Sequence, residues 1–100
     1  MILTSVKAEA ELPTEYSISQ NYPNPFNPTT TITFAVPKRS NVRIKIFDVV
    51  GKEVITVADK EFEPGIFNQN FNAEGLTSGI YFYRMESDGF SQTGKMMFLR

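Results

Sequence analysis

Cysteine, histidine and tryptophan are absent from this chain of 100 residues. Without cysteine, the chain has no disulfide framework, no thiol nucleophile and no thiolate metal site. Without histidine, it lacks the commonest general base, the serine–histidine–aspartate arrangement and the main ligand of transition-metal sites. We therefore expect a protein that is not an enzyme, with no catalytic residues, no metal site and no cofactor.

An excess of charge of one sign is also missing. The formal net charge is −1, and acidic and basic residues are interspersed along the chain. Nucleic acid and anionic membrane surfaces both need a basic field, so neither is an expected partner. No apolar run approaches the ~20 residues of a transmembrane helix, so we expect a chain that does not span a membrane.

The first residues carry only weak signals. Residues 1–9 lack the basic and long apolar regions of a signal peptide. If the protein is exported, we therefore expect this chain to be a piece of a longer precursor. Residues 1–15 are polar and mixed, and we expect them to form a linker or an N-terminal extension strand.

The most informative segment of the chain runs from Asn21 to Pro28. It holds three prolines, at Pro23, Pro25 and Pro28, together with the aromatic residues Tyr22 and Phe26. Proline excludes helix and removes backbone donors from any strand ladder. A polar linker does not need large aromatics, so we expect this segment to fold back onto a core at the entry of a β-domain.

The rest of the chain predicts a series of short strands. Residues 42–47 alternate most clearly, with Val42, Ile44 and Ile46 facing inward and Arg43 and Lys45 facing outward. Strands are expected at 16–20, 31–36, 42–47, 53–57, 67–71, 80–85 and 90–100. Such spacing is typical of an all-β, immunoglobulin-like, seven-stranded antiparallel β-sandwich, here without a disulfide. We expect it to occupy residues 16–100.

Residues with catalytic or ligand-binding chemistry are few. We interpret Glu53, Glu61 and Glu63 as surface charges, and we expect the Asp48 side chain to cap the amides of a tight turn. No calcium-loop spacing is present. Most aromatic residues fall at the core-facing positions of alternating strands, although a carbohydrate-binding platform remains an alternative.

Residues 95–100 form either an ordinary final strand or a recognition handle that a partner reads by strand addition or by capture of the carboxylate.

Three blocks of sequence resemble one known family. They are residues 19–30, residues 42–54 with their aromatic-Asp-x-x-Gly-basic-Glu hairpin, and residues 76–85 followed by 95–100. In this order and spacing they resemble the C-terminal sorting domain of proteins exported by the type IX (Por-type) secretion system. The fold is also similar to the immunoglobulin-like domain of the flagellar hook-capping protein.

The resemblance implies a role at the end of a larger exported cargo. Such a domain would cross the inner membrane with its cargo, fold in the periplasm and be recognised by an outer-membrane translocon. A sortase-like peptidase would then remove it, leaving the cargo secreted or at the cell surface. By resemblance, the residues expected in translocon recognition are Gly79, Tyr81, Lys95, Met96, Phe98 and Arg100.

The role of the opening motif and the function of the domain each have alternatives. Asn24, Pro25 and Phe26 match the opening motif of the family, and they either seat the first strand or take part in recognition. Besides sorting, two alternative functions remain. One is a structural module that self-associates through residues 1–15 into a dimer or fibre, and the other is an accessory carbohydrate-binding module.

Overall fold

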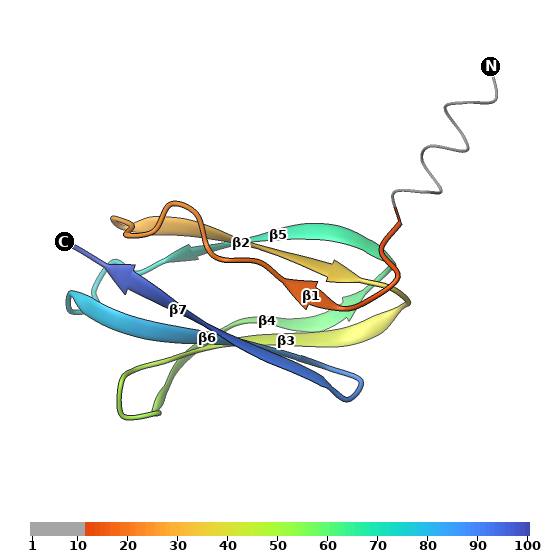
Figure 1. Cartoon of the computed structure of the whole chain (residues 1–100). Helices are drawn as coiled ribbons and strands as arrows, with labels where there is room; N and C mark the ends of the chain where they lie inside the picture. Colours follow the sequence, from red (N-terminus) through yellow and green to blue (C-terminus); the bar gives the residue numbers. More distant parts are fainter. Residues whose placement is uncertain (1–11) are drawn as a thin grey trace, which may run out of the picture.

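Two antiparallel sheets packed face to face make up the structure, a computed structural model that describes residues 12–100 (Figure 1). One sheet has the strand order β1-β2-β5, and the other has the order β4-β3-β6-β7. The strands are β1 (Ser17–Ile18), β2 (Thr29–Val36), β3 (Ser40–Phe47), β4 (Glu53–Phe62), β5 (Gly65–Asn72), β6 (Gly79–Ser87) and β7 (Phe90–Phe98). The expected seven-stranded β-sandwich without a disulfide is therefore confirmed.

Two strands differ in length from the expectation. β1 has only two residues, because the chain then enters the proline segment. β4 continues to Phe62 instead of ending at Val57, since Asp59 and Glu61 stay paired with β3. Residues 12–15 form no strand. The expectation of an extension strand otherwise falls on residues 1–11, outside the described part of the chain, and it stays a prediction.

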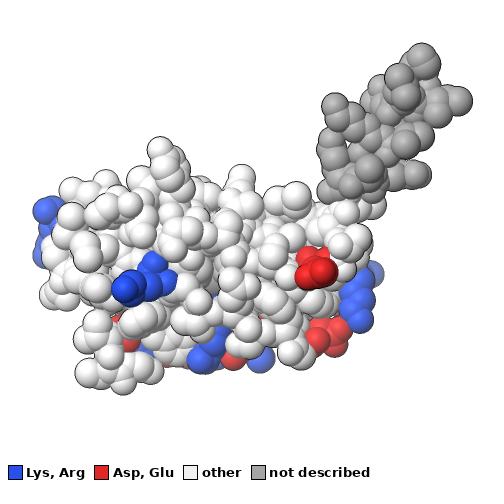
Figure 2. Space-filling model, in the orientation of Figure 1, with Lys and Arg blue, Asp and Glu red and all other residues white. Residues whose placement is uncertain are grey.

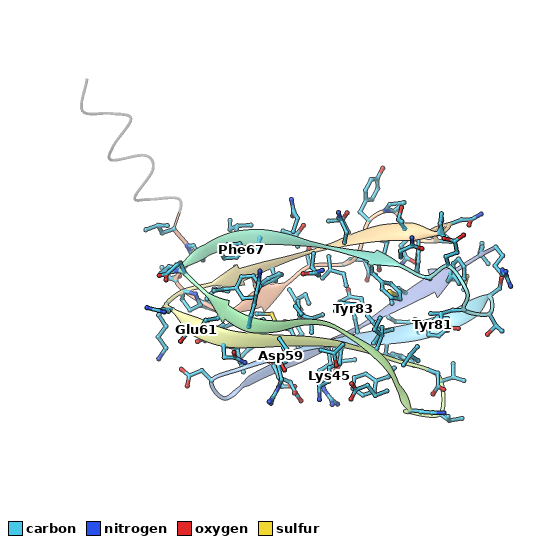
Figure 3. The ribbon with its side chains drawn as sticks, turned by 180° about the vertical axis from the view of Figure 1, so that it is seen from behind. Lys45, Asp59, Glu61, Phe67, Tyr81 and Tyr83 are labelled. Carbon is cyan, nitrogen blue, oxygen red and sulfur yellow. The ribbon has the colours of Figure 1, made fainter. Side chains whose placement is uncertain are left out.

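The core lies between the sheets, where the inward residues of the alternating strands meet. Ile32 and Phe34 of β2 are fully buried, as are Val42, Ile44 and Ile46 of β3. Figure 3 shows Tyr83 between the two sheets, with Lys45 and Asp59 on the outer side of the four-stranded sheet. Burial of one such apolar side chain stabilises a fold by about 1.5–3 kcal/mol. The core can therefore hold the sandwich together without a covalent link.

The hairpin turns follow local sequence chemistry. Between β3 and β4, the Asp48 carboxylate accepts hydrogen bonds from the backbone N–H groups of Val50 (3.0 Å) and Lys52 (2.9 Å), so the expected cap is confirmed. Gly51 in this turn has a φ of 87°, a conformation that favours glycine. Between β6 and β7, Asp88 and Gly89 both have positive φ, as a two-residue hairpin turn requires.

Gly94 in the middle of β7 makes room for a tyrosine ring. Its strand neighbour on β6 is Tyr83, whose ring crosses the place where a Cβ at Gly94 would lie. The Tyr83 hydroxyl donates a 3.0 Å hydrogen bond to the Ser19 carbonyl. Burial raises the pKa of the Tyr83 phenol above its usual value. The glycine thus allows one ring to link β6, β7 and the chain just after β1.

We predict that Gly94→Ala lowers the free energy of unfolding by about 1–3 kcal/mol, because the new methyl group overlaps the Tyr83 ring. Urea unfolding would measure the loss. In a Tyr83→Leu background the same substitution should cost much less, since the overlapping ring is gone. Equal losses in both backgrounds would contradict this explanation.

Candidate functional site

The proline segment and the last strand lie side by side. Phe26 forms a parallel bridge with Phe98. The Phe26 N–H donates to the Met97 carbonyl, and the Leu99 N–H donates to the Phe26 carbonyl, both at 3.0 Å. The Met97 N–H donates to the Asn24 side-chain oxygen at 2.9 Å. The opening motif therefore covers the outer edge of β7 near its end.

Proline chemistry explains why side chains take part in this contact. Pro23 and Pro25 have no backbone N–H and cannot extend a regular ladder. The Asn24 side-chain oxygen accepts one of the bonds from the β7 edge. Gln20 supplies a donor of the kind that the prolines lack, since its Nε2 donates to the Lys95 carbonyl at 2.8 Å. Side-chain amides therefore satisfy the β7 edge at Lys95 and Met97, just before the single backbone bridge at Phe98.

The segment is also held from within. Asn21 is 2% exposed, and its Nδ2 donates to the Thr30 hydroxyl at 3.0 Å and to the Pro23 carbonyl at 3.2 Å. The Thr30 hydroxyl itself donates to the Pro23 carbonyl at 2.8 Å. These bonds fix the bend that carries the chain from β1 toward β7. The sequence alone indicates no individual role for Gln20, Asn21 or Thr30.

Phe26 anchors the opening motif in the core. Its ring is buried and stacks on Phe98 at a centroid distance of 5.3 Å, and it meets Phe71 at 6.1 Å. The expectation that the aromatic residues of this segment pack onto a core is confirmed for Phe26. It is wrong for Tyr22, which makes only an isolated bridge to Thr31 and is 80% exposed.

The residues expected in translocon recognition fall into two groups. Tyr81, Met96 and Phe98 point into the core and are nearly fully buried, so a partner of the folded domain cannot touch most of their surface. Lys95 and Arg100 are exposed. Gly79 begins β6 opposite Phe98, with a φ of 151°. The role of these six residues in recognition stays a prediction.

The end of the chain is tied to the loop before β6. The Arg100 N–H donates to the Ser78 hydroxyl at 2.9 Å. In the same loop, the Tyr81 hydroxyl donates to the Thr77 carbonyl at 2.7 Å. One block of the family resemblance consists of residues 76–85 and 95–100. Its two parts are therefore held together by the Arg100–Ser78 hydrogen bond as well as by the β6–β7 pairing.

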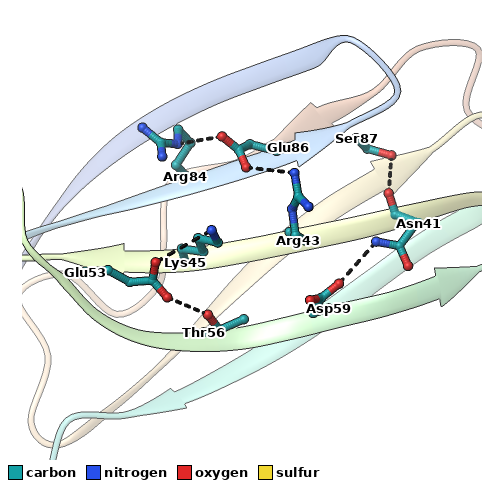
Figure 4. Close-up of polar contacts among 9 residues, drawn as sticks. All are labelled: Asn41, Arg43, Lys45, Glu53, Thr56, Asp59, Arg84, Glu86 and Ser87. Atoms are coloured by element: carbon teal, nitrogen blue, oxygen red, sulfur yellow. Dashed lines mark hydrogen bonds and ion pairs between the residues drawn. The ribbon is translucent and has the colours of Figure 1, made fainter.

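The charged side chains form ion pairs on the outer face of the four-stranded sheet (Figure 4). Arg43 lies 3.5 Å from Glu86, and Lys45 lies 3.6 Å from Glu53. A hydrogen bond from the Thr56 hydroxyl lowers the pKa of the Glu53 carboxyl, with a smaller contribution from Lys45. Such exposed pairs contribute little to stability, and they give no acid–base pair in a cleft.

Other kinds of site find little support in residues 12–100. No group of three acidic, histidine or cysteine residues there could hold a metal ion. Tyr22 is the one strongly exposed aromatic side chain in this range. Residues 12–100 contain no helix that is long and apolar enough to cross a membrane.

A family model described as the secretion system C-terminal sorting domain matches residues 20–98. The chain belongs to this family. The match begins at Gln20 and ends at Phe98, so it runs from the opening motif to the last strand of the sorting domain. The resemblance to type IX sorting domains is confirmed, and such a domain marks a secreted or cell-surface cargo. Neither a curated protein nor a solved structure matches the chain.

We predict that Asn24→Ala exposes the Met97 amide and lowers the free energy of unfolding by about 1 kcal/mol, because a single hydrogen bond at the sheet edge is lost. Amide hydrogen exchange followed by NMR should show faster exchange at Met97. As a matched control, Asn72→Ala removes the hydrogen bond that the Glu74 N–H donates to the Asn72 side-chain oxygen. It should speed exchange at Glu74 and leave Met97 unchanged, and unaltered exchange at Met97 in Asn24→Ala would contradict the assignment.

Proposed function

We propose that this sorting domain is read in its folded form by the outer-membrane translocon of the type IX system, after its cargo has crossed the inner membrane and the domain has folded in the periplasm. The observation that carries the proposal is the contact between Asn24, Phe26 and Met97. This contact joins the opening motif and the last strand into one surface. Two sequence blocks that resemble the family are thus presented together only when the domain is folded.

Recognition through side chains fits this surface better than strand addition does. A partner strand would pair with the backbone groups of Met97 and Leu99 at the outer edge of β7. Those groups already bond to Asn24 and Phe26. In our proposal the translocon therefore contacts exposed side chains such as Lys95 and Arg100, while Met96 and Phe98 hold the strand in place from the core side.

Removal of the domain by a sortase-like peptidase is part of the same proposal. The first strand begins at Ser17. A cut before this strand would separate the cargo from the sorting domain without breaking any pairing of the sandwich. The cargo would then be released or attached at the cell surface, and the folded sorting domain would stay behind as a separate product.

The test is an export assay with residues 1–100 fused to the end of a periplasm-directed reporter protein. The host is a bacterium with its own type IX system, and its own sorting domain on the same reporter is the positive control. We expect the reporter at the surface or in the medium, and in the periplasm of a strain without the translocon. Retention in the periplasm while the positive control is exported would overturn the proposal.

Deleting residues 96–100 should trap the reporter in the periplasm. This deletion removes Met96 and Phe98 from the core, so it combines loss of folding with loss of recognition. A shorter deletion of Leu99 and Arg100 leaves both core residues in place. If the machinery reads the folded surface, the shorter deletion should lower export while the melting temperature of the purified domain falls only slightly.

A further inference from the structure

The outer face of the four-stranded sheet changes character along its strands. Strand register places Arg43 beside Glu86 and Lys45 beside Arg84 in the charged part of this face. Farther along the same strands, Phe47 lies beside Phe82, and Ile80 lies beside Met97. All four of these apolar side chains point away from the core, since their strand neighbours point into it. The outer face of the four-stranded sheet thus ends in an apolar surface.

The β3–β4 hairpin extends this surface. Val49 and Val50 are 68% and 82% exposed. The turn is fixed by the Asp48 carboxylate and by Gly51, so neither valine is needed for its geometry. Exposed apolar groups that gather in one place mark interaction sites more often than single ones do. We call the surface formed by Phe47, Val49, Val50, Ile80, Phe82 and Met97 the apolar end.

Two pockets lie on the apolar end. One, of about 310 Å³, is lined by Phe47, Asp48, Val49, Gly51, Phe82, Arg84 and Thr93. The other, of about 260 Å³, is lined by Asn24, Pro25, Ile80, Lys95, Met96 and Met97. Phe82 in the first pocket and Lys95 in the second are direct neighbours across β6 and β7. The second pocket also includes the opening motif, so both pockets adjoin the surface described above.

The apolar end carries a small excess of positive charge, which comes from two lysines. The Arg84 guanidinium lies 4.5 Å from the centre of the Phe47 ring, but its charge is paired with Glu86 at 3.1 Å. Lys52 and Lys95 form no ion pair with any residue in the range 12–100. Asp48 keeps its negative charge while it accepts hydrogen bonds from backbone amides. The Glu53 carboxylate is paired with Lys45, so Lys52 and Lys95 outnumber the one acidic group here that lacks an ion pair, Asp48. Figure 2 shows that the flank between β1 and β7 carries few charged side chains. Charged side chains gather instead along the four-stranded sheet.

We propose that the apolar end is the docking surface for an acidic segment of the export machinery. This segment places apolar side chains in the two pockets and carboxylates beside Lys52 and Lys95. The inference rests on the proposed sorting function and names the chemistry of the partner. A second copy of the domain is the poorer occupant, because it would bring the same unpaired positive charges to the contact.

Export of the reporter fusion tests this surface with two substitutions, Val50→Asp and Met97→Asp. Each adds a negative charge where the partner is acidic, so we expect the double variant to be exported at least about tenfold less than the unaltered fusion. Ile66→Asp is the matched control. Ile66 is 62% exposed on β5, in the other sheet, and its variant should be exported normally.

Two results would overturn the docking surface. One is normal export of the double variant, and the other is an equal loss of export in Ile66→Asp. The unaltered fusion is measured alongside, and its export separates failure of this inference from failure of the sorting function. Circular dichroism should show a folded double variant. If it is unfolded, Val50→Asp alone gives the same test on a side chain at the tip of a turn, with reduced export expected and normal export overturning the inference.

The charge of the partner is tested separately. Lys52→Glu with Lys95→Glu should reduce export, whereas the two Lys→Arg changes should preserve it. Lys60→Glu is the control, because Lys60 lies over the Phe62 ring on β4, away from the apolar end. Unchanged export of the glutamate pair would overturn the acidic partner. Sedimentation that shows a dimer abolished by Val50→Asp would overturn it in favour of a second copy.

Discussion

The covering of the outer edge of β7 is the interaction on which the rest of this domain depends. A strand at the edge of a sheet presents unpaired N–H and C=O groups that invite another chain. Here β6 pairs with one side of β7, and the proline segment satisfies the other side through Asn24, Phe26 and Gln20. The same segment pairs with β2 through Tyr22. It therefore links the two sheets at their front flank and closes the sandwich there.

Much of the fold follows from the sequence because its causes are local. Alternation in residues 42–47 predicts the buried and exposed sides of β3, and Asp48 before a glycine predicts the cap of the hairpin. The aromatic Phe26 among prolines predicts a return to the core. The length of β4 was not predictable from alternation, since its second half is an exposed edge with polar residues on both faces.

The rest depends on contacts between distant parts of the chain. Nothing near Asn24 in sequence indicates that its side chain meets Met97, which lies 73 residues farther on. Gly94 alone also predicts nothing, because a glycine is needed at this position only to make room for the Tyr83 ring on the neighbouring strand. For the candidate site, the period of two along β7 separates buried Met96 from exposed Lys95. The apolar end appears only when the registers of β3, β6 and β7 are known.

The long reach of the Asn24–Met97 bond has a consequence for the timing of export. Within the domain, Asn24 is made early and Met97 late, so the edge of the sandwich cannot close until nearly the whole domain has been synthesised. A cargo whose chain stops before Met97 lacks the closed surface. A translocon that reads this surface would thus admit only cargo whose sorting domain has been translated as far as Met97.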